Sequence, residues 1–146
     1  MKATILFCLM ISIIIAGCAP QKSSPIEGAW KIVYGTWVRG DTVMGTLPGT
    51  WKGAGMKMWS KGHFAFVGRY GVDTSWSDSY GGGSYSLEGN RYQENIQFHT
   101  WKAAVGDSVK MLMEIKNDTL VQTWPLLENG QIDKSNFRQE KYIRMD

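Results

Sequence analysis

The sequence GGGSYSLEGNRYQENIQFH, residues 81–99, decides the fold. Its centre, Glu88-Gly89-Asn90, favours a tight hairpin turn because glycine and asparagine accept a positive φ. On both sides of this turn polar and apolar residues alternate, which is the period of a β-strand. A phosphate-binding glycine loop would need a helix after Gly81-Gly82-Gly83, and the alternation indicates none. The stretch therefore predicts a β-hairpin whose glycines let a strand bend at the rim of a barrel.

The same alternation continues through most of the chain, and no segment has a convincing helical period. Runs rich in aromatic and β-branched residues, separated by glycine and asparagine, predict eight strands. The predicted strands are Ala29–Val38, Ala54–Ser60, His63–Tyr70, Gly82–Leu87, Arg91–Trp101, Asp107–Lys116, Thr119–Trp124 and Phe137–Met145.

Short and long connections alternate between these strands. The tight turns are at residues 61–62, 88–90 and 117–118, and the long connections are at 39–53, 71–81, 102–106 and 125–136. In an up-and-down sheet, alternate connections lie at the same end. We therefore expect an all-β protein with an up-and-down antiparallel β-barrel of about eight strands. Tight turns close one end, four long loops fringe the other, and the interior is either filled or holds one small ligand.

The first residues predict export rather than fold. Lys2 precedes an apolar run, Ile5 to Ala16, that is shorter than the roughly 20 residues of a membrane span. Ile15-Ala16-Gly17-Cys18 resembles the lipobox of bacterial lipoproteins, in which the cysteine receives the lipid. We expect a signal peptide at 1–17, lipidated Cys18 and a tether at 18–27, and one barrel domain at 28–146. The expected location is the bacterial cell envelope, with a lipid anchor in the outer membrane, facing the periplasm.

Composition limits the partners. The formal net charge is +3, and the basic residues are scattered, which gives no support to nucleic-acid binding. Cys8 leaves with the predicted signal peptide, so Cys18 is the single cysteine of the mature chain and no internal disulfide can form. Seven tryptophans indicate a sizeable core, a ligand surface, or both.

Three segments resemble a known family. EGAWKIV, with Gly28 and Trp30, resembles the Gly-x-Trp opening of lipocalins and related calycin barrels. KMWSKGHFAFVGRY and the stretch quoted first resemble the lipocalin-like domains of small bacterial lipoproteins of unknown function. The resemblance implies that Arg144, on the last strand, packs across Trp30 and closes the base of the barrel. The chain lacks the disulfide pair, the C-terminal helix and the Thr-Asp-Tyr type motif of the secreted lipocalins, so their retinoid and odorant chemistry is not carried over.

The phase of strand 91–101 marks a candidate site. Tyr92, Ile96 and Phe98 share one face with Glu94, which places this carboxylate inside the barrel. A buried carboxylate must be paired or protonated. The candidate partners are Tyr85, Gln122 and Arg138. Two interpretations stay open: a structural hydrogen-bond network, or a polar anchor at the bottom of a ligand cavity.

Apolar residues recur with period two on several strands and are expected to face inward, as plain core or as ligand lining. They are Met56, Met58, Phe64, Phe66, Tyr70, Met111 and Met113. Five tryptophans lie in or beside the long loops: Trp37, Trp51, Trp76, Trp101 and Trp124. They indicate a binding surface at the rim, or else long loops that pack down on these rings as their own core. The candidate ligand-binding residues are Glu94, Tyr85, Phe98, Gln122, Met111, Met113, Trp51 and Trp76.

Signals for catalysis or metal binding are weak. His63 and His99 lack the spacing of metal ligands, no nucleophile elbow is present, and Asp73 and Asp78 lack the ligand density of a calcium loop. We therefore predict no catalytic residue, metal or cofactor. The expected function is a non-enzymatic, membrane-anchored lipoprotein that binds a small hydrophobic or amphipathic molecule at the open end of the barrel. The alternative is a protein-interaction module with a filled barrel, docking through its long loops; an enzyme using Glu94 has the least support.

Overall fold

The computed structural model describes residues 24–145. The predicted signal peptide, Cys18 and most of the predicted tether lie outside the described residues. Within residues 24–145, no helix is long and apolar enough to cross a membrane.

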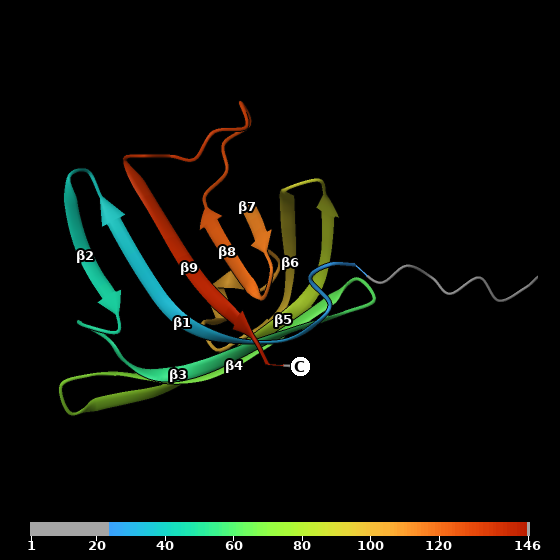
Figure 1. The fold of residues 1–146 in the computed structure, drawn as a ribbon. Coiled ribbons are helices and arrows are strands. Elements are labelled where there is room, and N and C mark those ends of the chain that lie inside the picture. The colour runs from blue at the N-terminus through green and yellow to red at the C-terminus, as the bar shows by residue number, and fades with distance from the viewer. Residues whose placement is uncertain (1–23, 146) are drawn as a thin grey trace, which may run out of the picture.

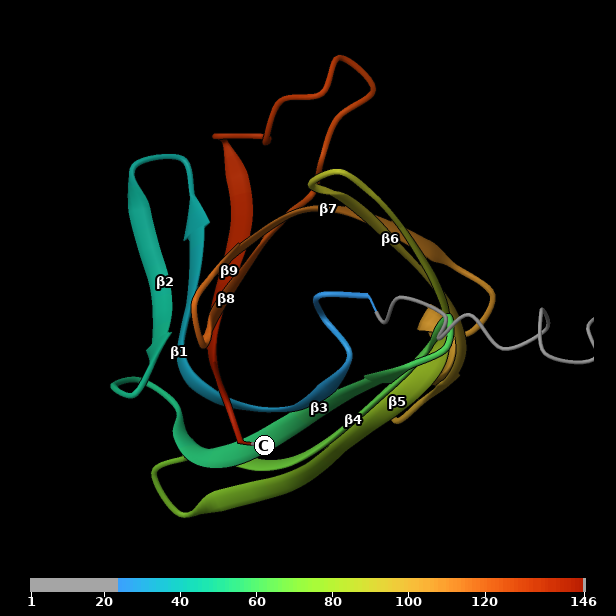
Figure 2. The same cartoon turned by 45° about the vertical axis from the view of Figure 1, so that its right-hand side comes forward.

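The described chain is all-β and forms one closed sheet (Figure 1). The strands are β1 (Gly28–Arg39), β2 (Thr42–Leu47), β3 (Lys52–Ser60), β4 (His63–Val72), β5 (Ser75–Glu88), β6 (Arg91–His99), β7 (Ser108–Lys116), β8 (Thr119–Trp124) and β9 (Asn136–Arg144). They are ordered β2-β1-β3-β4-β5-β6-β7-β8-β9, and β1 also pairs with β9, which closes the ring (Figure 2). The predicted up-and-down antiparallel barrel of eight strands is confirmed, with β2 as one extra strand.

Strand β2 lies where a long loop was predicted, so that part of the prediction was wrong. The first half of β1 pairs with β3, from Gly28 opposite Trp59 to Lys31 opposite Met56. Its second half pairs with β2 instead, from Gly35 opposite Leu47 onward. The second half of β1 is therefore separated from the start of β3. This separation opens the barrel at the end opposite the tight turns.

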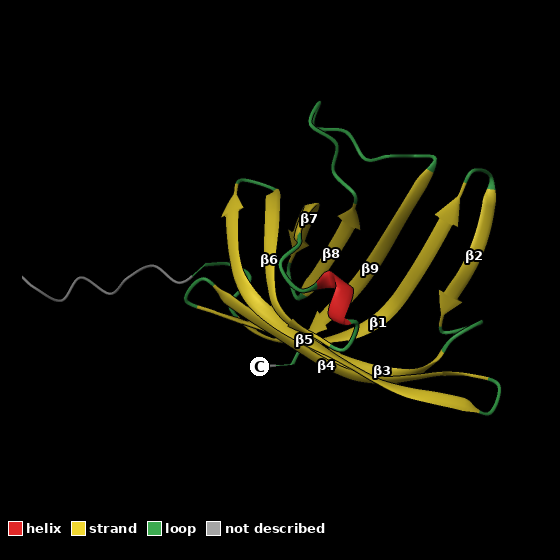
Figure 3. Cartoon of the chain, turned by 180° about the vertical axis from the view of Figure 1, so that it is seen from behind, coloured by secondary structure: helices red, strands yellow, loops and turns green. Residues whose placement is uncertain are grey.

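The predicted loop at 71–81 was also wrong. Strands β4 and β5 stay paired to Val72 opposite Ser75, and a tight turn with Asp73 at a φ of 53° joins them. The sequence hides this hairpin because its tip is polar and rich in serine. Of the four long loops predicted at the open end, two remain in the described chain. One, at residues 100–107, contains the single turn of 3-10 helix η2 (Lys102–Ala104), and the other is at 125–135 (Figure 3).

The three consecutive glycines lie inside β5, not in a rim loop, and they are buried. A Cβ added at Gly83 would lie 2.0 Å from the backbone oxygen of Asn95, and one at Gly81 would lie 2.4 Å from the Phe66 ring. A β-bulge occurs here, because the register with β6 shifts between Gly82 and Gly83. The glycines therefore allow a close approach of backbone and ring at a point where the strand bends.

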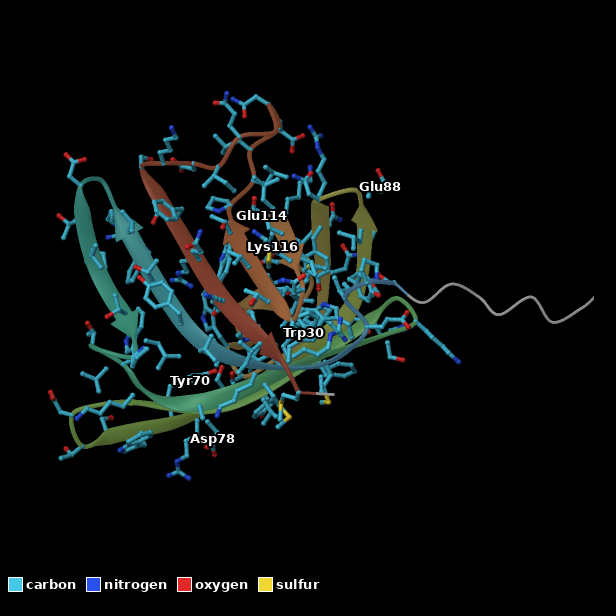
Figure 4. The ribbon with its side chains drawn as sticks, viewed as in Figure 1. Trp30, Tyr70, Asp78, Glu88, Glu114 and Lys116 are labelled. Atoms are coloured by element: carbon cyan, nitrogen blue, oxygen red, sulfur yellow. The ribbon has the colours of Figure 1, made fainter. Side chains whose placement is uncertain are left out.

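The end with the tight turns is closed by a packed core. It contains Ile26, Trp30, Trp59, Phe64, Tyr92, Met113 and Leu120, all at most 4% exposed. Ile26, which the sequence assigned to the tether, is part of this core, and its carbonyl accepts a hydrogen bond of 2.9 Å from Trp30 Nε1. The guanidinium of Arg144 lies 4.2 Å from the centroid of the Trp30 ring and donates to the carbonyl oxygens of Glu27 and Pro25, at 2.8 and 2.9 Å. Arg144 thus closes the base as the resemblance implies, and Figure 4 labels Trp30 there.

Candidate functional site

The phase of β6 places Glu94 inside the barrel but turns Phe98 out of it. Tyr92 and Glu94 are 1% and 4% exposed. Beyond them the bulge adds one residue, Gln97, and the alternation reverses. Phe98 is consequently 68% exposed on the outer face, and His99 points inward, edge-on against Phe66 at 5.5 Å between ring centroids. The prediction of Phe98 as an inward ligand contact was wrong because strict alternation cannot anticipate a bulge.

Glu94 is bound by a lysine that the sequence reasoning missed. Lys57, on β3, is 5% exposed and donates from Nζ to Glu94 Oε1 and, at 3.3 Å, to Gln122 Oε1. Tyr92 OH donates to the same Glu94 oxygen at 2.8 Å and accepts from Trp59 Nε1 at 2.7 Å. The network satisfies a buried ion pair with extra hydrogen bonds, which is what makes such a pair tolerable.

The expected phase of β3 explains why Lys57 was missed. Met56 and Met58 were predicted to face inward, but they are 36% and 41% exposed, and Lys57 and Trp59 take the inner positions. Apolar residues occupy both faces of this strand, so alternation alone does not choose between them. The bulky Trp59 was the available signal for the correct phase, because a side chain of that size is seldom left on an outer face.

The other residues predicted to form the site lie in different parts of the barrel. Gln122 is wholly buried. Its Oε1 accepts a hydrogen bond from Lys57, and its Nε2 donates to Met111 Sδ at 3.6 Å. Met111 lines the interior cavity, whereas Met113 packs in the closed core. Tyr85 is half-buried and stacks at a tilt on Tyr92, 5.6 Å between centroids, outside the cavity lining.

A second carboxylate, Glu140 on β9, faces the interior above this network. Tyr142 OH donates to Glu140 Oε2. Burial raises the pKa of Glu140, and the nearby Lys57 opposes this effect. Burial, with the charge of Glu140 as second cause, raises the pKa of Tyr70 to about 12. The sequence reasoning also missed Glu140, although its alternation with Arg138 and Tyr142 was a usable signal.

A cavity of about 630 Å³ lies above the two carboxylates and opens at the end opposite the tight turns. Its lining includes Ile32, Trp37, Trp51, Phe66, Tyr70, Ile96, Val109, Met111, Trp124 and Tyr142, together with Lys57, Glu94, Gln122 and Glu140. Gly35 and Gly55 also line it: the missing side chain of Gly35 leaves room in the wall, whereas the space beside Gly55 is taken by the Tyr70 hydroxyl. The cavity therefore combines mostly apolar walls with a polar floor.

The rim is more aromatic than polar, and it differs in part from the prediction. Trp37, Trp51, Trp101 and Trp124 line the cavity. Trp76 does not: it is 46% exposed and its indole lies against Gly71, on the extended β4–β5 hairpin. Arg138, a predicted partner of Glu94, instead stacks on the Trp37 ring at 4.9 Å, near the opening. Lys57, and not Arg138, is the cation beside Glu94.

The fold and the cavity together define an eight-stranded β-barrel with an interior open to one side, an architecture that suits either ligand binding or interaction. No family model matches the chain, and no curated protein matches its sequence. Among residues 24–145, no three His, Cys, Asp or Glu side chains are grouped closely enough to hold a metal ion.

Proposed function

We propose that the protein is a lipocalin-like lipoprotein that binds a small amphipathic molecule in the barrel cavity and does not catalyse a reaction on it. The observation that carries this proposal is the cavity itself, about 630 Å³ and open at one end. Ligand pockets have volumes of roughly 300–1,000 Å³ and combine apolar walls with a few placed polar groups. A filled barrel, which the interaction alternative requires, has no such volume.

The distribution of polar groups supports an amphipathic rather than a wholly apolar ligand. Lys57, Glu94 and Gln122 satisfy one another at the floor. Glu140 and Tyr70 have oxygen atoms on the cavity side that can take part in further hydrogen bonds. The tryptophans of the rim would contact the apolar part of the ligand, and these polar groups would orient its head.

The anchor belongs to the same proposal. The Ile-Ala-Gly-Cys run at 15–18 supports lipidation of Cys18 and a place in the bacterial envelope, at the outer membrane. Because β1 begins at the closed end, the segment from Cys18 would reach the barrel at its base. Seven residues between Cys18 and the buried Ile26 span at most about 25 Å. The mouth would then face away from the membrane.

Native mass spectrometry tests the proposal. Protein carrying Cys18→Ser, so that no acyl chain is attached, is purified without detergent and sprayed under non-denaturing conditions. A co-purifying small molecule that is lost from Trp51→Ala but retained by Trp76→Ala supports the binder, because Trp51 lines the cavity and Trp76 does not. A protein partner retained in place of a small molecule contradicts the proposal and favours the interaction module.

A further inference from the structure

We propose that the ligand carries a positively charged nitrogen and that Glu140, surrounded by aromatic rings, binds it. The inference rests on the proposed ligand-binding function and narrows the ligand to organic cations, such as protonated alkylamines or quaternary ammonium amphiphiles. The observation behind it is that the barrel interior contains two similar Tyr–Glu pairs. One of these pairs binds the ammonium group of Lys57.

The first pair, Tyr92 and Glu94 on β6, shows how this interior binds an ammonium group. Lys57 Nζ donates to Glu94 Oε1, and Tyr92 OH donates to the same oxygen. The ammonium lies 5.2 Å from the centroid of the Trp59 ring and 5.1 Å from that of Phe64. A carboxylate and the faces of aromatic rings therefore stabilise one cation together.

The second pair, Glu140 and Tyr142 on β9, repeats these parts beside the first network, with Glu140 opposite Gln122 on β8. The two residues have the same spacing of two along a strand, and Tyr142 OH donates to Glu140 Oε2. Among residues 24–145, no lysine or arginine forms an ion pair with Glu140, and Oε1 accepts no hydrogen bond. Arg138 lies on the same strand, but its guanidinium stacks on Trp37.

The surroundings of Glu140 suit a cation. The aromatic rings that line the cavity above it are those of Trp37, Trp51, Phe66, Tyr70, Trp101 and Trp124. Within residues 24–145, the carboxylates of Glu94, Asp107 and Glu140 line the cavity together with the cationic groups of Lys57 and Arg138. The ammonium of Lys57 is already bonded to Glu94 and Gln122. Burial raises the pKa of Glu140, and an adjacent cation would favour its ionised form. Arg138, at the mouth, is the group that would favour an anionic ligand instead.

Isothermal titration calorimetry with three matched probes tests the inference. Octylammonium, octanoate and octanol have the same chain length and carry a positive, a negative and no charge at pH 7. We expect octylammonium to bind at least about tenfold more tightly than the other two. Octanoate binding as tightly or more tightly overturns the inference but leaves the proposed function standing. Failure of all three to bind, with no co-purifying small molecule, contradicts both.

Matched variants assign the effect to Glu140. Glu140→Gln keeps the shape of the side chain and is expected to weaken octylammonium binding about tenfold while leaving octanol binding unchanged. Unchanged octanol affinity also shows that the variant retains its cavity. Glu114→Gln, on the outer face of β7, removes a distant charge and should alter neither affinity. If Glu140→Gln binds octylammonium as tightly as the native chain does, Glu140 is not the site. If Arg138→Gln binds octanoate less tightly than the native chain does, the charge that selects the ligand is that of Arg138 at the mouth instead.

Discussion

At the scale of single residues, the interior is organised by charge. Lys57 and Glu94 are buried together, and each would be costly to bury alone because desolvation disfavours an isolated charge. Tyr92 and Gln122 complete the hydrogen bonds of the pair. In the described chain, every fully buried side-chain nitrogen and oxygen atom has a hydrogen-bond partner. Because the attraction within the pair is offset by the cost of removing both charges from water, the pair adds little net stability. Its effect is to fix which side chains meet at the floor of the cavity.

We predict that Lys57→Met lowers the free energy of unfolding by about 3–5 kcal/mol at pH 7, because it leaves the Glu94 carboxylate buried without its cation. The double variant Lys57→Met with Glu94→Leu removes both charges and should recover most of that loss. Urea denaturation of the two variants measures the difference. A double variant as unstable as the single one would show that packing, not charge, causes the effect.

Glu140 predicts the opposite sign of pH dependence from an ordinary surface carboxylate. Its pKa in the folded state is raised above the ordinary 4.5, so the folded state binds more protons than the unfolded state in that window. Stability should therefore fall as the pH rises from about 4.5 through the folded pKa. The titratable and charged groups that act on it are Lys57, Tyr70, Glu94, Arg138 and Tyr142.

We expect Glu140→Gln to be more stable than the native chain at pH 7 and to lose this advantage near pH 4, because glutamine does not titrate. Thermal unfolding followed at several pH values measures the difference. Glu114→Gln is the control for the loss of one charge. An advantage of Glu140→Gln that is the same at both pH values would contradict the assignment of the raised pKa to this group.

At the scale of elements, bulges set which side chains meet. A register shift between Ile32 and Tyr34 in β1 reverses its alternation and turns Gly35 and Trp37 inward. The bulge of β6 does the same for His99. Each shift moves later residues of its strand to the other face, since the side-chain period is two. On β1 and β6, the cavity is therefore lined in part by residues that simple alternation places outside.

Gly83 is essential to the bulge of β6. A Cβ at this position would lie 2.0 Å from the backbone oxygen of Asn95, which cannot move aside as a side chain can. We predict that Gly83→Ala destabilises the protein by about 1–3 kcal/mol, as overpacking does. The midpoint of chemical denaturation is the measurement, with Ser86→Ala, exposed on the same strand, as the control. A tolerated Gly83→Ala would mean that the bulge adapts without cost.

At the scale of the whole molecule, the core that stabilises the fold lies at the closed base, and the cavity proposed to bind the ligand opens at the mouth. The core of the base surrounds Trp30 and Trp59, whereas the mouth is widened where β1 leaves β3 and pairs with β2. The two parts can therefore be altered independently. A change in the cavity wall should affect the ligand without affecting the base.

Gly35→Leu tests this separation. A Cβ at Gly35 would make ordinary contacts, at 3.6 Å from Leu47 and 3.9 Å from Glu140, and a longer side chain would extend into the cavity. We expect at least a tenfold loss of probe affinity with little change in the melting temperature. Ala65→Leu, an insertion of similar size on the outer face of β4, should leave the affinity unchanged. Retained affinity in Gly35→Leu would mean that the ligand does not enter the barrel.

The resemblance to lipocalins implied the closure by Arg144 over Trp30, and the local sequence determined most of the strands, the tight turns of the barrel and the inward position of Glu94. These depend on alternation and turn chemistry within a few residues, which a sequence displays directly. Tertiary structure alone decided that Lys57 meets Glu94 and that Phe98 points outward. The physical reason is that a residue's face depends on bulges and on pairing between strands far apart in the chain, and neither leaves a periodic signal. The cavity exists because those non-local pairings join β1 to β9 and separate it from β3.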